Sequence, residues 1–285
     1  MLSINCKGKL LTFEQPVVMG IINVTPDSFY SGSRMSNLDT VVATAKKMIE
    51  EGAQILDIGG QSTRPGSIRI DAVEELKRVM PSIEAISKNI PNSVISIDTF
   101  YASVAEQAIN AGASIVNDVT AGSIDENLIP TVAALKVPYV LMHMKGDPQT
   151  MQKAPVYQDV LLEVYDFLNF KIAELQAAGI DDIIVDPGFG FGKTADHNLK
   201  LLSSLHFFKN LGKPILAGLS RKATIYKTLN IEPADALNGT TVLNTIALMN
   251  GASILRVHDV KEAVEAVKLV SAYTKAKEQE KPALH

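Results

Sequence analysis

The chain has 285 residues, of which 46% are hydrophobic and 20% are charged, and its formal net charge is -4. A weakly acidic chain has no overall electrostatic attraction to nucleic acid or to an anionic membrane, so neither is an expected partner. The single cysteine, Cys6, excludes an internal disulfide and fits a reducing compartment. The sequence shows no secretory signal pattern and no apolar run long enough to span a bilayer, which favours a cytoplasmic protein.

Short apolar runs alternate with longer amphipathic stretches along the chain. In chain order, the predicted strands are 17–22, 54–58, 93–97, 114–116, 137–142, 182–185, 214–217 and 253–257, and the helices that follow them are 37–51, 71–90, 101–111, 126–135, 157–178, 197–210, 233–250 and 260–275. The strands are continuously apolar, which is typical of parallel strands covered by helices. A capping pattern at Asp71 and Glu74 and a glycine at position 52 mark helix ends.

This alternation predicts a closed (β/α)8 TIM barrel. The alternative, an open doubly wound sheet, requires a glycine-rich turn after its first strand, where this sequence has INVTPDS. We expect a single (β/α)8 barrel domain over residues 1–285. Within it, residues 1–15 form a hairpin across the bottom of the barrel, and the charged residues 276–285 form a frayed tail.

Polar residues concentrate immediately after the predicted strands. They are Asn23, the segment GGQSTRPG, Asp98, Asn117 with Asp118, His143 after Met142, the segment DPGFGFGK, the segment GLSRK, and Arg256 with His258. In barrels of this type the chemistry lies on the loops that follow the strands. Because buried polar groups cost free energy unless they are paired, this concentration indicates an active site at that end of the barrel.

Two other kinds of site are not favoured by the sequence. The segment DPGFGFGKT has proline at position 187, where a phosphate-binding P-loop requires glycine. The five histidines are scattered, and no CxxC or HExxH pattern occurs, so a transition metal caged by protein ligands is not expected.

Several longer segments carry a family resemblance. GIINVTPDSF, DIGGQSTRPG, SIDT, NDV, DPGFGFGK, SRK and RVHDV occur in this order across residues 20–260, and together they resemble the signatures of the bacterial dihydropteroate synthases. The resemblance implies a (β/α)8 barrel that joins 6-hydroxymethyl-7,8-dihydropterin diphosphate to p-aminobenzoate with Mg²⁺ and releases diphosphate. It also implies a step of folate synthesis, a sulfonamide target, and a homodimer formed through helices of the C-terminal half.

The resemblance implies a pterin site made of Asp98, Asn117, Met142, Asp186, Gly218 and Lys222. A carboxylate such as Asp186 can accept two parallel N–H bonds from the aminopyrimidinone edge of a pterin. Five of these six residues have a simpler structural interpretation: Asp186 as a turn former, Asp98 and Asn117 as a packed polar pair, Met142 as core, and Lys222 as a solvated lysine.

The other implied subsites bind p-aminobenzoate through Thr63, Arg64, Pro65, Phe191, Ser220 and Lys222, and bind diphosphate through Asn23, Thr63, Arg64, Arg256 and His258. Asn23 would also contact Mg²⁺, a hard cation that depends on substrate phosphates for further ligands. Phe191 as a loop plug remains an alternative. Arg221 is interpreted as a structural ion-pair partner, and His143 and Lys193 are left without a role.

The implied catalytic residues are Asp98, Lys222, Asn23 and Arg256. Diphosphate leaves first, and the arylamine then attacks a pterin-stabilised cation, near which Asp98 can stabilise positive charge. Two departures from the family pattern are Gln61, where glutamate is usual, and YSGS at residues 30–33. The alternatives are a barrel that transfers a methyl group from methyltetrahydrofolate to a corrinoid protein, and a non-catalytic pterin-binding barrel.

Overall fold

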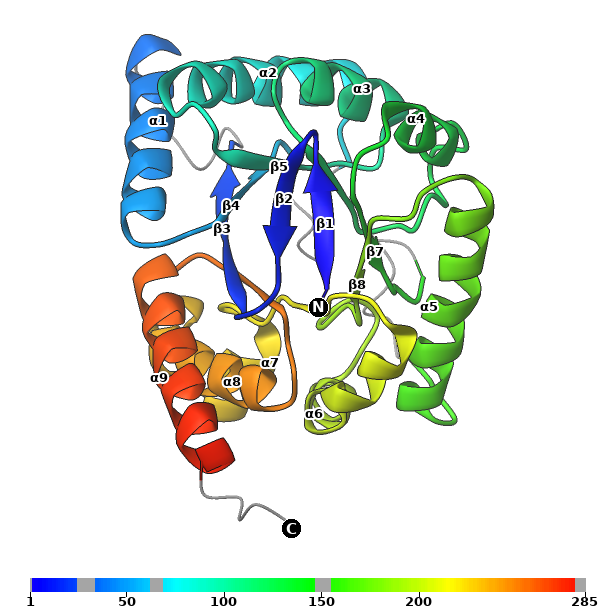
Figure 1. The fold of residues 1–285 in the computed structure, drawn as a ribbon, viewed down its shortest axis with the longest axis vertical. Coiled ribbons are helices and arrows are strands. Elements are labelled where there is room, and N and C mark those ends of the chain that lie inside the picture. The colour runs from blue at the N-terminus through cyan, green and yellow to red at the C-terminus, as the bar shows by residue number, and fades with distance from the viewer. Residues whose placement is uncertain (1, 25–33, 62–68, 147–154, 280–285) are drawn as a thin grey trace.

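The computed structural model describes residues 2–24, 34–61, 69–146 and 155–279. Parallel strands form a sheet in the order β8-β7-β6-β5-β4-β3-β10-β9, and a parallel bridge between Val185 and Ile215 joins its two edges. The strands are β3 (Val17–Asn23), β4 (Ile55–Gly59), β5 (Val94–Asp98), β6 (Ile115–Asp118), β7 (Tyr139–Met142), β8 (Ile183–Asp186), β9 (Leu216–Ala217) and β10 (Ile254–Val257). The closed barrel with helices around it is confirmed (Figure 1).

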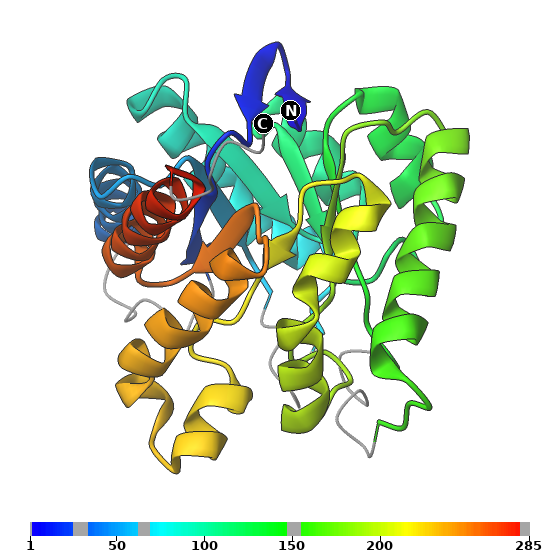
Figure 2. The same ribbon diagram turned by 60° about the horizontal axis from the view of Figure 1, so that its bottom comes forward.

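A hairpin closes the N-terminal end of the barrel, as predicted (Figure 2). Its strands, β1 (Ser3–Cys6) and β2 (Lys9–Thr12), are antiparallel. Ile4 and Cys6 are buried in a cluster that includes at least one apolar residue from each barrel strand. Burial also raises the pKa of the Cys6 thiol to about 12, so the thiol stays protonated and unreactive.

The helices surround the barrel and pack their apolar faces on the outer side of the strands. They are α1 (Arg34–Glu50), α2 (Ala72–Asn89), α3 (Ala102–Asn110), α4 (Leu128–Leu135), α5 (Val160–Ala177), α6 (Ala195–Ser203), α7 (Ala223–Leu229), α8 (Leu237–Met249) and α9 (Val260–Gln279), with 3-10 helices η2 (Leu205–Leu211) and η3 (Pro233–Asp235). The Asp71 carboxylate accepts a hydrogen bond from the Glu74 N–H, which is the predicted cap of α2. None of the helices in the described ranges is long and apolar enough to cross a bilayer.

The structure differs from the predicted elements in the C-terminal third. The predicted helix 197–210 is interrupted at Ser204, beyond which the chain continues as the 3-10 helix η2. The short helix α7 was not predicted, because seven residues ending at a left-handed Asn230 span only two turns and show little periodicity. The predicted helix 233–250 divides into η3 and α8.

The prediction that the tail is frayed from residue 276 is wrong for its first four residues. Helix α9 continues to Gln279, because Ala276, Lys277, Glu278 and Gln279 are all good helix formers. Residues 280–285 lie outside the described ranges. Since α9 packs against α8 and β3 near its start, the extension does not affect the open end of the barrel.

The inner face of the barrel changes from apolar to polar over one layer of residues. Near the hairpin, the inward positions are Met19, Ile55, Val94, Ile115, Val140, Ile184, Leu216 and Ile254, all buried in one cluster. Side chains on a strand alternate between its two faces, so the next inward position on each strand is two residues further on. Those positions hold Ile21, Asp57, Ser96, Asn117, Met142, Asp186, Gly218 and Arg256. The polar side chains therefore face one another inside the barrel, toward its C-terminal end.

Candidate active site

A buried network of charges lies at the centre of the polar layer. Arg256 on β10 donates from Nε to Asp57 Oδ2 at 2.7 Å and from Nη2 to Asp98 Oδ2 at 2.7 Å. The Asn117 side-chain amide donates to the same Asp57 oxygen at 3.1 Å. Four strands thus contribute to one network, and Asp98 and Asn117 are joined through Arg256 and Asp57 instead of forming the isolated pair considered from the sequence.

Asp57 is the residue of this network that the sequence reasoning missed. It is fully buried on β4, and its Oδ1 atom is buried without a hydrogen-bond partner. A charged residue inside the apolar run ILDIG was the available signal, because a buried charge is costly unless it is paired.

The electrostatics of the network keep Arg256 charged. Although burial opposes it, the neighbouring carboxylates of Asp57 and Asp98 raise the pKa of Arg256. Burial raises the pKa of Asp98 to about 7, while Arg256 works in the opposite direction. The site therefore holds a permanent guanidinium beside two carboxylates, and Arg256 retains part of its surface at the open end of the barrel.

Asp186 and Lys222 face the same small space. Asp186 is buried, and its Oδ1 accepts a hydrogen bond from Gly188 N at 2.7 Å, so the carboxylate does form a turn, as the simpler interpretation supposed. A Cβ placed on Gly218 would lie 3.5 Å from Lys222 Nζ and 3.9 Å from Asp186 Oδ2. Gly218 thus leaves room in which the second carboxylate oxygen and the ammonium can both meet a ligand.

Burial shifts the pKa values of both Asp186 and Lys222. Burial raises the pKa of Asp186, and the Lys222 charge lowers it. Burial lowers the pKa of Lys222 to about 8, and the Asp186 charge opposes that change. Lys222 donates to the backbone oxygen of Phe189 at 2.6 Å, which holds its side chain over the site instead of in solvent.

An apolar wall flanks the charged layer. Met142 and Phe191 pack with Phe100 and Val119, and Lys222 Nζ lies 4.8 Å from the centre of the Phe191 ring. Met142 is buried, as the core interpretation required, but it is buried in this separate cluster at the C-terminal end. Sequence reasoning did not single out Phe100 and Val119, because apolar residues after a strand resemble ordinary core. The wall is suited to one face of a flat ring.

Ser220 and His258 meet on the β9–β10 side. Ser220 Oγ is 3.0 Å from His258 Nδ1 and accepts a hydrogen bond from the His258 N–H at 3.2 Å. Between Ser220 and Lys222, Arg221 has a left-handed backbone and makes two hydrogen bonds of 2.9 Å to Asp259. Arg221 is thus the structural ion-pair partner that the sequence predicted.

Asn23 lies at the rim beside Asp98. It pairs with Gly59 on β4, which pairs with Asp98 on β5. A Cβ on Gly59 would lie 3.7 Å from both Asn23 Oδ1 and Asp98 Oδ2. The glycine therefore lies between these two oxygen atoms without covering them. Asn23 is exposed.

Other predicted contacts, Thr63, Arg64 and Pro65, lie outside the described residues, as do residues 30–33. Gln61 lies just before the segment that contains Thr63, Arg64 and Pro65, and it accepts a hydrogen bond from Ile70 N at 2.8 Å. A glutamate carboxylate would accept the same bond. The departure at position 61 therefore preserves this contact across the base of the segment.

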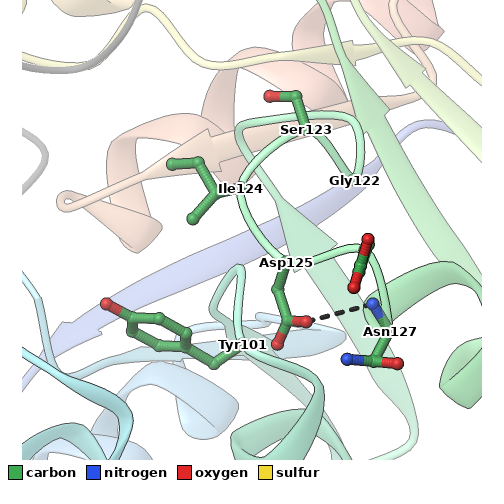
Figure 3. Close-up of a pocket in the computed structure, with 7 residues that line it drawn as sticks. Tyr101, Gly122, Ser123, Ile124, Asp125 and Asn127 are labelled. Atoms are coloured by element: carbon green, nitrogen blue, oxygen red, sulfur yellow. Dashed lines mark hydrogen bonds between the residues drawn. The ribbon is translucent and has the colours of Figure 1, made fainter.

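A hollow of about 510 Å³ lies outside this layer, between Tyr101 and the loop of residues 122–127 (Figure 3). Asp125 uses its carboxylate there to accept from Ala102 N at 2.8 Å and from Asn127 N at 3.0 Å. These bonds satisfy the starts of α3 and α4. The hollow contains none of the predicted site residues, and its acid is occupied by the scaffold.

Comparison with known proteins agrees with this geometry. The family model described as "Pterin binding enzyme" matches residues 19–258. A dihydropteroate synthase of Escherichia coli K12 is 44% identical over 96% of this chain and 98% of its own length, and that of Bacillus subtilis 168 is 40% identical over 94% and 93%.

Solved structures give the same result at the level of the fold. A Xanthomonas albilineans dihydropteroate synthase with 4-aminobenzoic acid has a TM-score of 0.89 and 42% identity, covering 95% of this chain and 98% of that one. The enzyme from the same organism in complex with 7,8-dihydropteroate has a TM-score of 0.86 and 40% identity, covering 96% and 99%. The chain belongs to the family of pterin-binding enzymes.

Proposed function

We propose that this barrel is a dihydropteroate synthase, a transferase of folate synthesis that joins 6-hydroxymethyl-7,8-dihydropterin diphosphate to p-aminobenzoate and releases diphosphate. The observation that carries the proposal is the single polar layer that holds Asp186, Asn117, Asp57 and Arg256 beside an apolar wall. In this layer Asp186 can accept hydrogen bonds from the edge of a ring, Asn117 supplies an amide, and Arg256 supplies a cation that can bind phosphate. The relatives named above are dihydropteroate synthases over nearly the same length of chain.

In this proposal the pterin lies flat against Met142 and Phe191 with its polar edge toward Asp186 and Asn117. Asp186 has one carboxylate oxygen occupied by Gly188 N, and the other faces the space beside Gly218. A pterin edge offers parallel N–H donors that a carboxylate can accept. Asn117 supplies both a donor and an acceptor, and Lys222 supplies a cation at the remaining edge.

The diphosphate and p-aminobenzoate positions follow from the rest of the rim. Arg256 presents a planar guanidinium suited to phosphate oxygens, with His258 directly after the same strand, β10, and Asn23 at the end of the neighbouring strand, β3. We place the aminobenzoate ring beside Phe191 and Lys222, with its carboxylate toward Ser220. Thr63, Arg64 and Pro65 are assigned to these two subsites by family resemblance.

The oxygen atoms at the rim are suitable ligands for magnesium. Mg²⁺ keeps several waters and takes few protein ligands, all of them oxygen. The Asn23 amide oxygen is such a ligand, and it lies beside the place proposed for the diphosphate. When bound, the metal would neutralise charge on the leaving diphosphate.

The reaction requires no covalent bond to the protein. The bond between the pterin methylene carbon and the diphosphate oxygen breaks, and the oxygen keeps the electron pair. The resulting cation is delocalised over the pterin, and the Asp98 carboxylate, held by Arg256, stabilises it. The arylamine nitrogen then bonds to the methylene carbon and loses a proton, and closure of the site against water prevents hydrolysis.

A direct test is to incubate the purified protein with the dihydropterin diphosphate, p-aminobenzoate and Mg²⁺ and to measure dihydropteroate by chromatography. Asp186→Asn is expected to lower kcat/KM by about 100-fold, because an amide cannot accept both N–H bonds from the pterin edge. Asp182→Asn is the matched control, since Asp182 lies at the opposite end of β8 and accepts a bond from Asn5 N. Near-normal turnover by Asp186→Asn would contradict the site assignment.

The pH profile tests the role of Lys222. Its pKa is lowered to about 8, so its ammonium charge is present below that pH and is lost as the pH rises through it. We expect kcat/KM to fall on the alkaline side with an apparent pKa near this value. Lys222→Arg stays charged over the whole range and should be slower but free of this fall. An identical alkaline limb in the arginine variant would rule out Lys222 as its source.

The metal proposal predicts a change in Mg²⁺ dependence. Asn23→Ala removes a ligand oxygen, so the Mg²⁺ concentration for half-maximal rate should rise by about tenfold. Titration of the initial rate with Mg²⁺ measures this, and thermal unfolding controls for folding. An unchanged Mg²⁺ dependence would remove Asn23 from the metal site.

We also propose a homodimer formed through the C-terminal helices. Val242, Ile246 and Met249 on α8 are exposed and follow a spacing of four and then three residues, which places them on one face of the helix. Leu269 and Tyr273 on the neighbouring α9 are exposed as well. Light scattering should give twice the chain mass of 30.7 kDa, and Ile246→Glu should reduce it to that of one chain. A wild-type protein that scatters as a monomer would exclude the dimer.

A further inference from the structure

Lys193 is a buried lysine in the loop that follows β8, and the mechanism above gives it no role. It is 3% exposed. Its Nζ lies 2.9 Å from His143 Nδ1 and donates to three backbone oxygens, those of His143 at 3.2 Å, Gly188 at 2.9 Å and Phe191 at 3.1 Å. An ammonium has three N–H donors, and four acceptor atoms of the protein share them, so none is left for a substrate.

The His143 ring is suited to be an acceptor. Burial, together with the Lys193 charge, lowers the pKa of His143 to about 3. The ring is therefore neutral, and Nδ1 can accept a hydrogen bond from the lysine. His143 follows β7 directly and Lys193 lies 50 positions further along the chain, so the contact fastens the loop after β8 to the end of the neighbouring strand.

The loop is pressed closely against that strand. Gly188 has a φ of +73°, and a Cβ at this position would lie 1.9 Å from the backbone oxygen of His143. No residue with a side chain fits there. The close approach brings the Gly188 and His143 carbonyls together, and two carbonyl oxygens that point into one space repel each other unless a cation lies between them. The Lys193 Nζ lies between these two carbonyl oxygens and donates to both, although burial lowers the pKa of Lys193 to about 7.

The same short loop supplies three contacts to the pterin site. Gly188 N donates to Asp186 Oδ1 at 2.7 Å, Phe189 O accepts from Lys222 Nζ at 2.6 Å, and the Phe191 ring belongs to the apolar wall. Lys193 binds the carbonyls of residues 188 and 191, which bracket Phe189. The positions of Asp186, Lys222 and Phe191 therefore all depend on the loop conformation that Lys193 stabilises.

We propose that Lys193, with His143 as its partner, is a positioning residue for the pterin half of the site. It acts through the loop of residues 187–192 and does not touch the substrate. The proposal rests on the proposed function, because it assumes that Asp186 and Lys222 bind the pterin. It separates the site into a pterin half that depends on Lys193 and a diphosphate half at Arg256 that does not.

The proposal is tested by measuring ligand binding to the pterin half and to the diphosphate half of the site separately. Lys193→Met keeps the length and apolar stem of the side chain but removes the ammonium. Binding of 6-hydroxymethylpterin and binding of inorganic diphosphate with Mg²⁺ are measured separately by calorimetry. We expect pterin affinity to fall by about tenfold or more and diphosphate affinity to change by less than about twofold, because Arg256 is held by Asp57 and Asp98 on other strands.

Tyr139→Phe is the matched control. It removes one buried hydrogen bond, from Tyr139 to Asp118 at 2.7 Å, on the strand that carries His143, and it leaves the loop untouched. Thermal unfolding should show lowered stability in both variants, but only Lys193→Met should lose pterin affinity. His143→Leu should show a smaller loss of pterin affinity, since Lys193 keeps its three carbonyl acceptors.

Each outcome has a distinct meaning. Equal losses of pterin and diphosphate affinity in Lys193→Met, or an equal loss of pterin affinity in Tyr139→Phe, would show that Lys193 contributes only to stability. Unchanged pterin affinity in a folded Lys193→Met would also overturn the proposal. If the wild-type protein binds neither pterin nor diphosphate, it is the proposed function that fails.

Discussion

The carboxylate of Asp57 is the point on which the mouth of this barrel depends. One of its oxygens accepts from both Arg256 and Asn117, which lie on strands far apart in the chain. A buried carboxylate without partners would be strongly destabilising, and so would a buried guanidinium. Together they are tolerated, and their pairing fixes the position of the Arg256 guanidinium relative to the Asn117 amide. Under the proposed function, this one interaction sets the geometry of both the diphosphate and the pterin positions.

The other charged side chains of the polar layer are also opposed by groups of opposite charge. Three carboxylates, those of Asp57, Asp98 and Asp186, lie within the layer or at its rim and are opposed by Arg256 and Lys222. Burial shifts the pKa values of Asp98, Asp186 and Lys222 toward their neutral forms, and the opposite charges of Arg256, Lys222 and Asp186 partly offset these shifts. A ligand that brings a polar edge and a diphosphate enters a site where each charge already has a fixed direction. Little reorganisation is then required when charge develops during the reaction.

Much of the fold and the location of the candidate site could be predicted from the sequence, because strands alternate with helices in a (β/α)8 barrel and its site residues follow the strands. Strand–helix alternation gave the fold, and polar residues at strand ends such as Asp98, Asn117 and Asp186 gave the location of the site. Asp57 was overlooked because it lies within a predicted strand, where its apolar neighbours dominated the interpretation. Counting two residues onward from the apolar layer would have found it, since Asn117, Asp186 and Arg256 occupy the same inward layer.

Other features depended on long-range contacts that no local pattern contains. The contact of Lys193 with His143 follows from the placement of two neighbouring loops, and Phe100 and Val119 become part of a ligand wall only through the neighbours they meet. Helix α7 was missed because seven residues carry too little periodicity. For Lys193, Phe100 and Val119 the cause is the same: the identity of each residue was clear, but its partners were fixed by closure of the barrel.

Under the proposed function, one layer of inward residues binds the pterin edge and the diphosphate side by side. A crystal structure of the protein with 6-hydroxymethylpterin, diphosphate and Mg²⁺ would show whether this is so. We expect ring nitrogens within hydrogen-bonding distance of Asp186 and Asn117, and phosphate oxygens at Arg256. A pterin bound elsewhere, such as in the hollow beside Tyr101 and Asp125, or a diphosphate that does not contact Arg256, would contradict it.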